Sequence, residues 1–349
     1  MRKIILVISS LFILCIVRAQ DPHFSQFTSS GMNLNPALTG IMEGQYRFHI
    51  AYRDQWSKLG PSYKTIAAGA DFRYHIVSDD FASFGIKLLR DQAGDGGYNQ
   101  TYGHLSGGYM KKLFGGRNAA KQYVAGGVQL GVGQHGINWD ELWFGNQFDA
   151  SILAENIDLP TGETDILIGS GSTEIFMDVG AGLSYIAIFD DRKNIYGGAA
   201  MHHINEPVIS LFSDANVRLA SRITIHGGGE WLLSDNLSML PAFQLQFQQS
   251  HRLYQVGSRI RYNSFENKEI GLRVGAWLRM VSGINSNLEA EAIIASAMLE
   301  FSDYQFGFSY DITLSELRIA NNRQGAFEFT LSYLFPVTQR IYKIESPRL

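Results

Sequence analysis

Two short motifs carry residue types that could ligate a metal ion. His202, His203 and Glu206 offer two imidazoles and a carboxylate. If a strand runs through the two histidines, their side chains point to opposite faces and cannot easily share one ion. Asp91 to Gly97 gathers carboxylates in a Gly-rich run, but it lacks the alternating acidic positions of a calcium-binding EF-hand loop. A tight β-turn fits that run better, and we expect no metal site and no cofactor.

Two further motifs are typical of enzymes. Gly131 to Gly136 matches the dinucleotide-binding pattern G-x-G-x-x-G, yet no βαβ unit or following helix accompanies it, which favours a Gly-rich strand running into a loop. Ser309-Tyr310-Asp311 suggests a hydrolase, but the chain has no G-x-S-x-G elbow and nothing places a histidine beside Ser309. We therefore expect that the protein is not an enzyme, with a barrel hydrolase as a minority alternative.

The composition excludes several classes of protein. The chain has 349 residues, with 33 acidic and 29 basic side chains, so no basic excess indicates a nucleic-acid surface. A hydrophobic content of 45% is too low for a bundle of membrane helices. The 22 Phe and 16 Tyr residues argue against disorder. Thirty-six Gly against 8 Pro, with 12% aromatic residues, fits a closed β-structure.

The first 19 residues read as a secretory signal peptide. Arg2 and Lys3 precede an apolar run over 4–17, which is short for a transmembrane helix, and small residues flank a cleavage site after Ala19. An uncleaved anchor helix is the alternative. The signal carries three of the basic residues, so 26 remain against 33 acidic ones and the mature net charge is −7.

A lipoprotein signal ending at Cys15 is a weaker alternative, because Leu14 is too bulky for a lipobox. Since Cys15 is the only cysteine of the sequence, cleavage after Ala19 leaves none. The mature chain then has no disulfide, thiol nucleophile or Cys-ligated metal.

Alternating hydrophobicity dominates the rest of the chain. In 325–335, one face carries Phe327, Phe329, Leu331, Tyr333 and Phe335, while the other is mostly polar. Three more segments show the pattern clearly, and ten show it with interruptions by Gly. Together they predict about fourteen strands, at 44–53, 63–75, 82–91, 98–110, 122–134, 176–189, 193–203, 219–231, 239–247, 252–262, 269–280, 292–301, 304–310 and 325–335.

The links between these strands alternate in length. Those after even-numbered strands are short and polar, at 190–192, 234–236, 263–268 and 302–303, whereas long links lie at 139–173, 205–218 and 311–324. Short periplasmic turns and long external loops are typical of outer-membrane barrels. We predict an all-β fold consisting of a single transmembrane antiparallel β-barrel of about 14 strands, with an N-terminal segment in the periplasm or lumen. A secreted β-sandwich or propeller is the alternative, although no repeat of about 40 residues is evident.

A set of short motifs resembles the PorP/SprF family of outer-membrane proteins of the type IX secretion system in Bacteroidetes. The matching segments are Asp21–Phe27, Asn35–Gly40, Tyr52–Trp56, Asp91–Gly96, Leu142–Phe148, His203–Pro207, Ser309–Asp311, Ser315–Leu317 and 325–335. The resemblance implies an integral outer-membrane barrel that works with type IX secretion and gliding-motility subunits. It also implies help in exporting a secreted adhesin-like partner, or in retaining it at the surface, through the partner's C-terminal domain.

The domain organisation follows from these segments. Residues 1–19 form the signal peptide, 20–43 an N-terminal segment, 44–335 the barrel and 336–349 a C-terminal tail. The N-terminal segment either plugs the lumen, with Phe24 and Phe27 as contacts, or is a flexible terminus. Within the matched motifs, the candidate plug and family residues are Phe24, Gln26, Phe27, Asn35, Pro36, Arg53 and Trp56.

We expect a non-enzymatic role in secretion and surface anchoring. The expected partners are a secreted protein and outer-membrane lipid, and we expect no binding of nucleic acid. Aromatic residues often dominate protein interfaces, so the external-loop candidates for partner binding are Trp139, Trp143, Phe144 and Phe148. Packing of this loop onto the barrel mouth is the alternative. The competing function is a transporter or porin for a hydrophobic or small solute.

Overall fold

The computed structural model describes most of the chain after residue 20. The described residues are 21–42, 44–57, 60, 62–76, 79–94, 97–115, 120–142, 171–190, 192–211, 216–263, 270–282 and 287–335. The expected signal peptide and C-terminal tail lie outside them. Among the described residues, no helix is both long and apolar enough to cross a bilayer.

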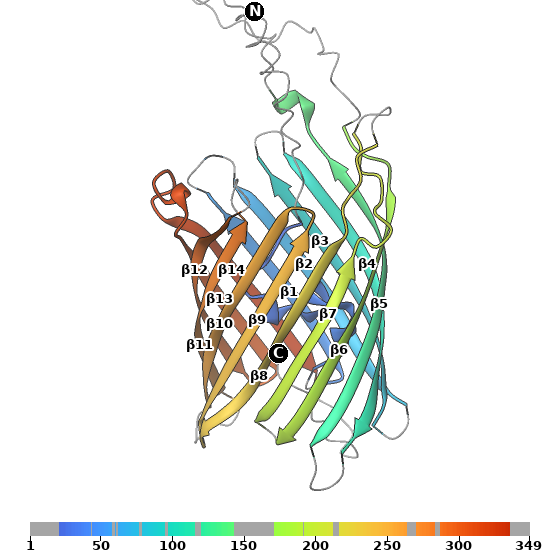
Figure 1. Cartoon of the computed structure of the whole chain (residues 1–349), viewed down its shortest axis with the longest axis vertical. Coiled ribbons are helices and arrows are strands. Elements are labelled where there is room, and N and C mark those ends of the chain that lie inside the picture. The colour runs from blue at the N-terminus through green and yellow to red at the C-terminus, as the bar shows by residue number, and fades with distance from the viewer. Residues whose placement is uncertain are drawn as a thin grey trace, which may run out of the picture.

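The described residues form fourteen strands that close into one antiparallel barrel (Figure 1). Each strand pairs with its neighbours in sequence, so the chain runs up and down around the barrel. The strands are β1 (Tyr46–Gln55), β2 (Tyr63–His75), β3 (Phe81–Ala93), β4 (Tyr98–Phe114), β5 (Lys121–Gly136), β6 (Phe176–Asp190), β7 (Lys193–His202), β8 (Arg222–Ser234), β9 (Leu237–Gln248), β10 (His251–Asn263), β11 (Ile270–Ser282), β12 (Leu288–Phe301), β13 (Tyr304–Thr313) and β14 (Gln324–Phe335).

The first and last strands close the sheet. β1 pairs with β14 over ten residue pairs, from Tyr46 with Phe335 to Gln55 with Ala326. This ladder gives partners to backbone groups that would otherwise face hydrocarbon, where no water can satisfy them. Closure therefore removes the open edge on which an apolar sheet would aggregate.

Alternation along each strand sorts the side chains between lipid and lumen. On β13, Tyr304, Phe306 and Phe308 are exposed on the outer wall, whereas Ser309 and Asp311 are buried inside. The same period of two places arginines and carboxylates inward on many strands. The outer wall is thus a continuous apolar band, and the lumen is lined by charge.

The two ends of the barrel differ. One end has short links, such as those from β6 to β7 and from β12 to β13, and we call it the floor. The other end, which we call the outer mouth, has longer links, for example from His202 to Arg222. Aromatic side chains cluster at the floor, where Tyr304 and Tyr333 lie with ring centroids 4.5 Å apart. Such girdles mark the membrane interface of outer-membrane barrels.

The predicted fold is confirmed. All fourteen expected strands are present, and β2 has the expected bounds of 63 and 75, while most others extend by a few residues beyond the hydrophobic pattern. The expected difference between short and long links is also confirmed at the strand ends.

The lipid-facing wall provides a test of the fold. Val256 is exposed on the outer face midway along β10, and Tyr262 is exposed on the same face near the floor. Val256→Arg should lower the free energy of unfolding by about 2–4 kcal/mol, because it places a charge near the bilayer midplane. Tyr262→Arg, close to the interface, should cost about 1 kcal/mol or less.

Urea unfolding in lipid vesicles would measure both values. Equal costs for the two variants, or no cost at Val256, would contradict the assignment of this face to lipid.

Candidate functional site

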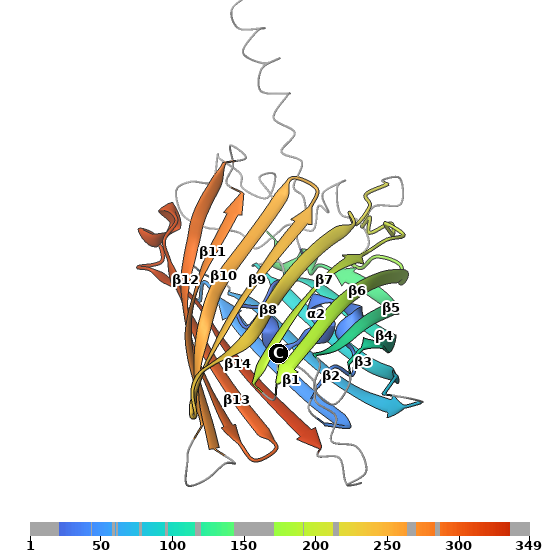
Figure 2. The ribbon, with the colours of Figure 1, turned by 60° about the horizontal axis from the view of Figure 1, so that its bottom comes forward.

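Residues 21–42, which we call the lumenal segment, lie inside the barrel. The segment contains three short helices, η1 (Phe27–Ser29), α2 (Gly31–Leu34) and η2 (Pro36–Leu38). Figure 2 shows α2 enclosed by the strands. Asp21 contacts His203 and Arg222 at the outer mouth, whereas the Gly40 amide donates to Asp71 Oδ2 (2.7 Å) near the floor. The segment thus runs through the lumen from mouth to floor and then enters β1.

Asn35 and Pro36 hold the second half of the segment against the wall. Asn35 Oδ1 accepts from the Ala37 amide (2.8 Å) and so caps η2, while its Nδ2 donates to the Leu183 carbonyl (3.0 Å). A Cβ at Gly182 would lie 1.9 Å from Asn35 Oδ1, and one at Gly127 would lie 2.4 Å from the Pro36 oxygen. Glycine at these wall positions therefore permits the close approach of the segment.

Apolar contacts fill the space between the segment and the wall. Phe27 packs edge-to-face on Trp277 of β11, with ring centroids 5.3 Å apart. Phe24 joins Ala51 and Ala67 in a separate cluster, and Leu38 is fully buried. Burial of such side chains stabilises the packed segment by about 1.5–3 kcal/mol each relative to exposure.

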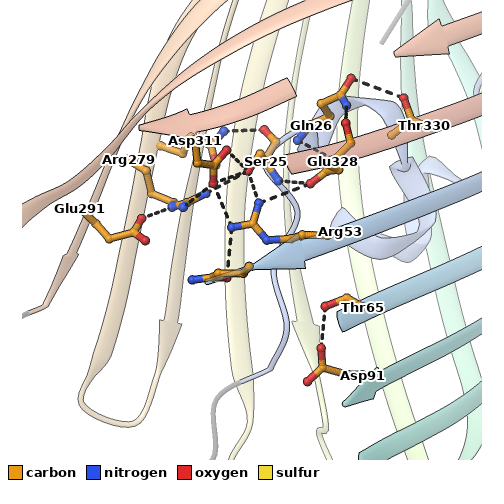
Figure 3. A network of polar contacts seen from close by, with 12 residues as sticks. Ser25, Gln26, Arg53, Thr65, Asp91, Arg279, Glu291, Asp311, Glu328 and Thr330 are labelled. Atoms are coloured by element: carbon orange, nitrogen blue, oxygen red, sulfur yellow. Dashed lines mark hydrogen bonds and ion pairs between the residues drawn. The ribbon is translucent and has the colours of Figure 1, made fainter. Parts of the chain in front are cut away.

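Ser25 lies at the centre of a buried ionic network (Figure 3), the Ser25 cluster, which also contains Arg53, Arg279, Asp311 and Glu328. Ser25 Oγ donates to Asp311 Oδ1 (2.7 Å) and accepts from Arg279 Nη1 (3.1 Å) and from Arg53 Nη1. Both guanidinium groups also donate to Asp311 Oδ2, at 2.9 Å from Arg53 and 2.7 Å from Arg279. Side chains of β1, β11 and β13 thus meet at the hydroxyl group of one serine of the segment.

The Glu328 carboxylate binds the backbone of the segment. Its Oε2 accepts from the Ser25 amide (2.7 Å) and its Oε1 from the Gln26 amide (3.0 Å). Gln26 also donates from Nε2 to the Glu328 carbonyl (3.4 Å). A buried carboxylate that accepts two successive amides orients the chain that supplies them.

A second network, the Asp21 cluster, consists of Asp21, His104, Asp178, His203 and Arg222. His203 bridges two carboxylates, with Nε2 2.7 Å from Asp21 Oδ2 and Nδ1 2.7 Å from Asp178 Oδ1. His104 Nε2 lies 2.7 Å from Asp178 Oδ2, and Arg222 Nη1 lies 2.8 Å from Asp21 Oδ2. The cluster joins the start of the segment to β4, β6 and the outer ends of β7 and β8.

The charges of this cluster shift the pKa values of its members. Burial lowers the pKa of His203, but the Asp21 and Asp178 carboxylates outweigh burial and raise it to about 9. Burial likewise acts to raise the pKa of Asp21, yet His203 and Arg222 hold that pKa well below its usual range. Both groups are therefore ionised at neutral pH.

The structure brings together six of the candidate plug and family residues. Phe24, Gln26, Phe27, Asn35 and Pro36 lie in the lumenal segment, and Arg53 reaches it from β1. Trp56 lies apart from them. It is half-buried beyond the outer end of β1, where it packs edge-to-face on Tyr63 with ring centroids 5.3 Å apart.

The partner-binding candidates are only partly described. Trp139 begins the short helix η3 (Trp139–Glu141) beyond the outer end of β5 and is half-buried. Trp143, Phe144 and Phe148 lie outside the described residues, so their role stays a prediction.

The motifs that resembled metal sites occupy other roles. Asp91 lies in β3 and accepts from Thr65 Oγ1 (2.6 Å), and Gly94 and Gly97, both with positive φ, lie in the turn that follows. His202 ends β7, and His203 has a φ of 54°, so strand alternation does not apply and both rings are buried. The expectation that these two side chains point to opposite faces was wrong for this reason. No group of metal-binding side chains is present in the described part of the chain.

The enzyme-like motifs lie in strands. Gly131 to Gly136 is part of β5, as its interpretation as a Gly-rich strand required. Ser309 and Asp311 lie in β13, and Asp311 belongs to the Ser25 cluster.

Sequence reasoning missed most partners of the lumenal segment. Arg279, Glu328, Asp178 and Arg222 were not among the candidates, and Asp21 and Asp311 were named only as parts of short motifs. The sequence did contain one indication of these partners. Five of the six residues lie in strands, and each places a charged side chain on the lumen face of an amphipathic strand. Such a pattern marks lumen-facing charges but does not say which of them meet.

Comparison with known proteins gives one family. A family model described as type IX secretion system membrane protein PorP/SprF matches residues 16–333. No curated protein matches the sequence significantly.

Solved structures show only weak similarity. The toluene transporter TbuX from Ralstonia pickettii is 11% identical with a TM-score of 0.47, covering 88% of this chain and 94% of that one. A TodX deltaS2S3 mutant, a monoaromatic hydrocarbon channel, is 11% identical with a TM-score of 0.48, covering 87% and 93%. CdiB from Acinetobacter baumannii is 9% identical with a TM-score of 0.44, covering 83% of this chain; the match spans 60% of CdiB's length. At these values the similarities support no statement about function.

The Ser25 cluster can be tested by removing its shared carboxylate charge. Asp311→Asn leaves Arg53 and Arg279 buried without their common counter-ion, which should cost about 3 kcal/mol or more. The population with the segment released should then rise roughly a hundredfold. Chymotrypsin cleavage after Phe24 in detergent would report the release.

Asp303→Asn, in the turn between β12 and β13 at the floor, is the matched control and should leave cleavage slow. Equal cleavage rates for both variants would show that the cluster does not hold the segment.

The Asp21 cluster predicts a loss of stability at alkaline pH. His203 loses its proton near pH 6.5 in the unfolded chain but near pH 9 in the folded protein. Its contribution, about 3 kcal/mol, is therefore complete below pH 6.5 and is lost as the pH rises through 9. Thermal unfolding of the mature barrel at pH 6 and 9.5 would measure this loss.

The pH dependence of the unfolding temperature should be smaller in His203→Gln. It should persist in the control variant His75→Gln, which changes a histidine near the floor. A wild-type pH dependence in the His203 variant would contradict the assignment.

Proposed function

Because the chain belongs to the PorP/SprF family of type IX secretion system membrane proteins, we propose that it assists a secreted partner protein at the outer membrane. The barrel would help export this partner, or retain it at the cell surface, by binding the partner's C-terminal domain. Other subunits of the secretion and gliding machinery would act with it, after export of this chain through a signal peptide cleaved after Ala19. We propose a binding role without catalysis.

The observation that carries this proposal is the occupied lumen of a secretion-family barrel. The lumenal segment contributes buried side chains from Phe24 to Met42 and is tied to the wall by two ionic networks. An open solute channel needs a continuous aqueous path through the barrel. The contacts between the lumenal segment and the wall narrow that path along much of the barrel. A filled lumen fits a protein that holds a partner better than one that conducts small solutes.

The outer mouth is the surface that fits a secreted partner. The longer links gather there, and apolar side chains such as Ile204, Val208 and Val217 are exposed on the link between β7 and β8. Trp139 lies on the link between β5 and β6. Aromatic side chains often contribute much of the affinity of an interface, and exposed apolar side chains add contact area around them.

A cell-surface assay tests this proposal. Deletion of the protein should release its partner into the medium or leave it unexported, as measured by surface labelling and mass spectrometry of the medium. A variant with Trp139, Trp143 and Phe144 replaced by Ala should lose most of the retained partner. Phe114→Ala, an exposed aromatic residue at the floor end of β4, is the control and should retain it.

Conductance in planar bilayers separates the competing function. The intact barrel should carry no steady open-channel current, and deletion of 21–42 should increase any current. Full retention of the partner by the triple variant would overturn the assignment of the loop. A steady current through the intact protein would favour a transporter instead.

A further inference from the structure

A cavity lies between the lumenal segment and the wall, on the side of the outer mouth. Its lining includes Asp21, Phe24 and Leu34 of the segment, together with Lys87 and His104 of β3 and β4. The cavity is partly open, and its volume is about 60 Å³. A cavity needs about 10–15 Å³ for each water molecule, so this space has room for about four to six waters. It therefore suits the end of a longer ligand rather than a whole one.

Lys87 is the cation of this cavity that lacks a carboxylate partner. Its ammonium group donates to Gln129 Oε1 (3.2 Å), a neutral acceptor, and no ion pair within 4.0 Å joins it to a described carboxylate. Lys87 is nonetheless 94% buried. A buried ammonium without a counter-ion is costly, so the position favours an incoming anion.

The other charges around the cavity balance one another. His203 has a carboxylate oxygen within hydrogen-bond distance of each ring nitrogen, and both nitrogens donate only in the imidazolium form. His203 and Arg222 therefore neutralise Asp21 and Asp178. The charge of Lys87 remains as a surplus of one, which a single monoanion would neutralise.

His104 adds an acceptor beside this cation. Its Nε2 donates to ionised Asp178, which leaves Nδ1 as a lone-pair acceptor, and Nδ1 is buried without a hydrogen-bond partner. Lys87 and His104 are directly paired across β3 and β4, so the two side chains leave the wall about 5 Å apart. A ligand that meets both needs an anionic group and an N–H donor close together.

The C-terminus of a polypeptide has this chemistry, because the last residue carries a carboxylate and its own amide N–H. We propose that the cavity receives the C-terminal carboxylate of a polypeptide entering from the outer mouth, with Lys87 as its counter-ion and His104 accepting the last amide. Phe24, Leu34 and Leu89 give the lining an apolar portion for the terminal side chain. The inference rests on the proposed function, since it names the part of the partner that would reach the lumen.

Calorimetry with small probes tests the inference on the detergent-solubilised mature protein. N-acetyl-leucine carries both the carboxylate and the amide N–H, and N-acetyl-leucinamide lacks only the charge. The first probe should bind, and the second should bind about ten- to hundredfold more weakly, as expected for the loss of a charged hydrogen bond. Equal affinity for the two probes would overturn the inference, and this comparison needs no variant.

Variants then locate the site. Lys87→Met should weaken N-acetyl-leucine binding by about ten- to hundredfold. The matched control is Lys111→Met, which changes an exposed lysine near the floor and should leave affinity unchanged. An unchanged affinity in Lys87→Met would overturn the site.

Acetate separates the two sources of a carboxylate. It should bind more weakly than N-acetyl-leucine, because it offers no amide and no apolar side chain. Equal affinities would indicate a site for free small acids and overturn the chain-end proposal. If no probe binds while deletion of the protein still releases the partner from cells, this inference fails and the proposed function stands.

Discussion

Satisfaction of backbone hydrogen bonds within the membrane is the constraint on which the rest of this structure depends. Hydrocarbon offers no partner for an amide or a carbonyl, so a sheet that crosses it must have no edge. The ladder between β1 and β14 meets this requirement. Once the sheet is closed, side-chain alternation necessarily produces an apolar outer wall and an enclosed inner face. The lumen is a consequence of closure, and its chemistry depends on what the inward positions carry.

Those inward positions carry many charges, and a buried charge without a partner is costly. The lumenal segment takes part in this pairing, because Ser25 lies between Arg53, Arg279 and Asp311, and Asp21 shares His203 with Asp178. Buried ion pairs are weak evidence for net stability, since desolvation offsets much of their attraction. Their directional contacts do specify one position and one direction for the segment. We interpret the two clusters as determinants of register, with the packing of Phe27 and Leu38 supplying the apolar contribution.

The direction of the segment has a consequence for the proposed role. Its first described residue, Asp21, lies at the outer mouth, although β1 begins at the floor. The segment therefore runs lengthwise through the lumen before the chain turns into β1. It also forms part of the cavity that faces the mouth, so the same residues that fill the barrel shape the surface offered to a partner.

The sequence by itself determined the fold, because strand formation and sidedness are local properties. A period of two between apolar and polar residues identified all fourteen strands, and link lengths identified the two ends. The family motifs also named residues of the lumenal segment, among them Phe27, Asn35 and Pro36. Only the tertiary structure decided which lumen-facing charges meet. Ser25 and Asp311 are 286 residues apart, and closure of the barrel brings them together. The positive φ of His203 likewise overrode alternation, since contacts with Asp21 and Asp178 orient its ring. Alternation determines whether a side chain faces lipid or lumen. Its partner across the lumen depends on strand register, barrel curvature and the path of the segment, and no local sequence pattern encodes these three features.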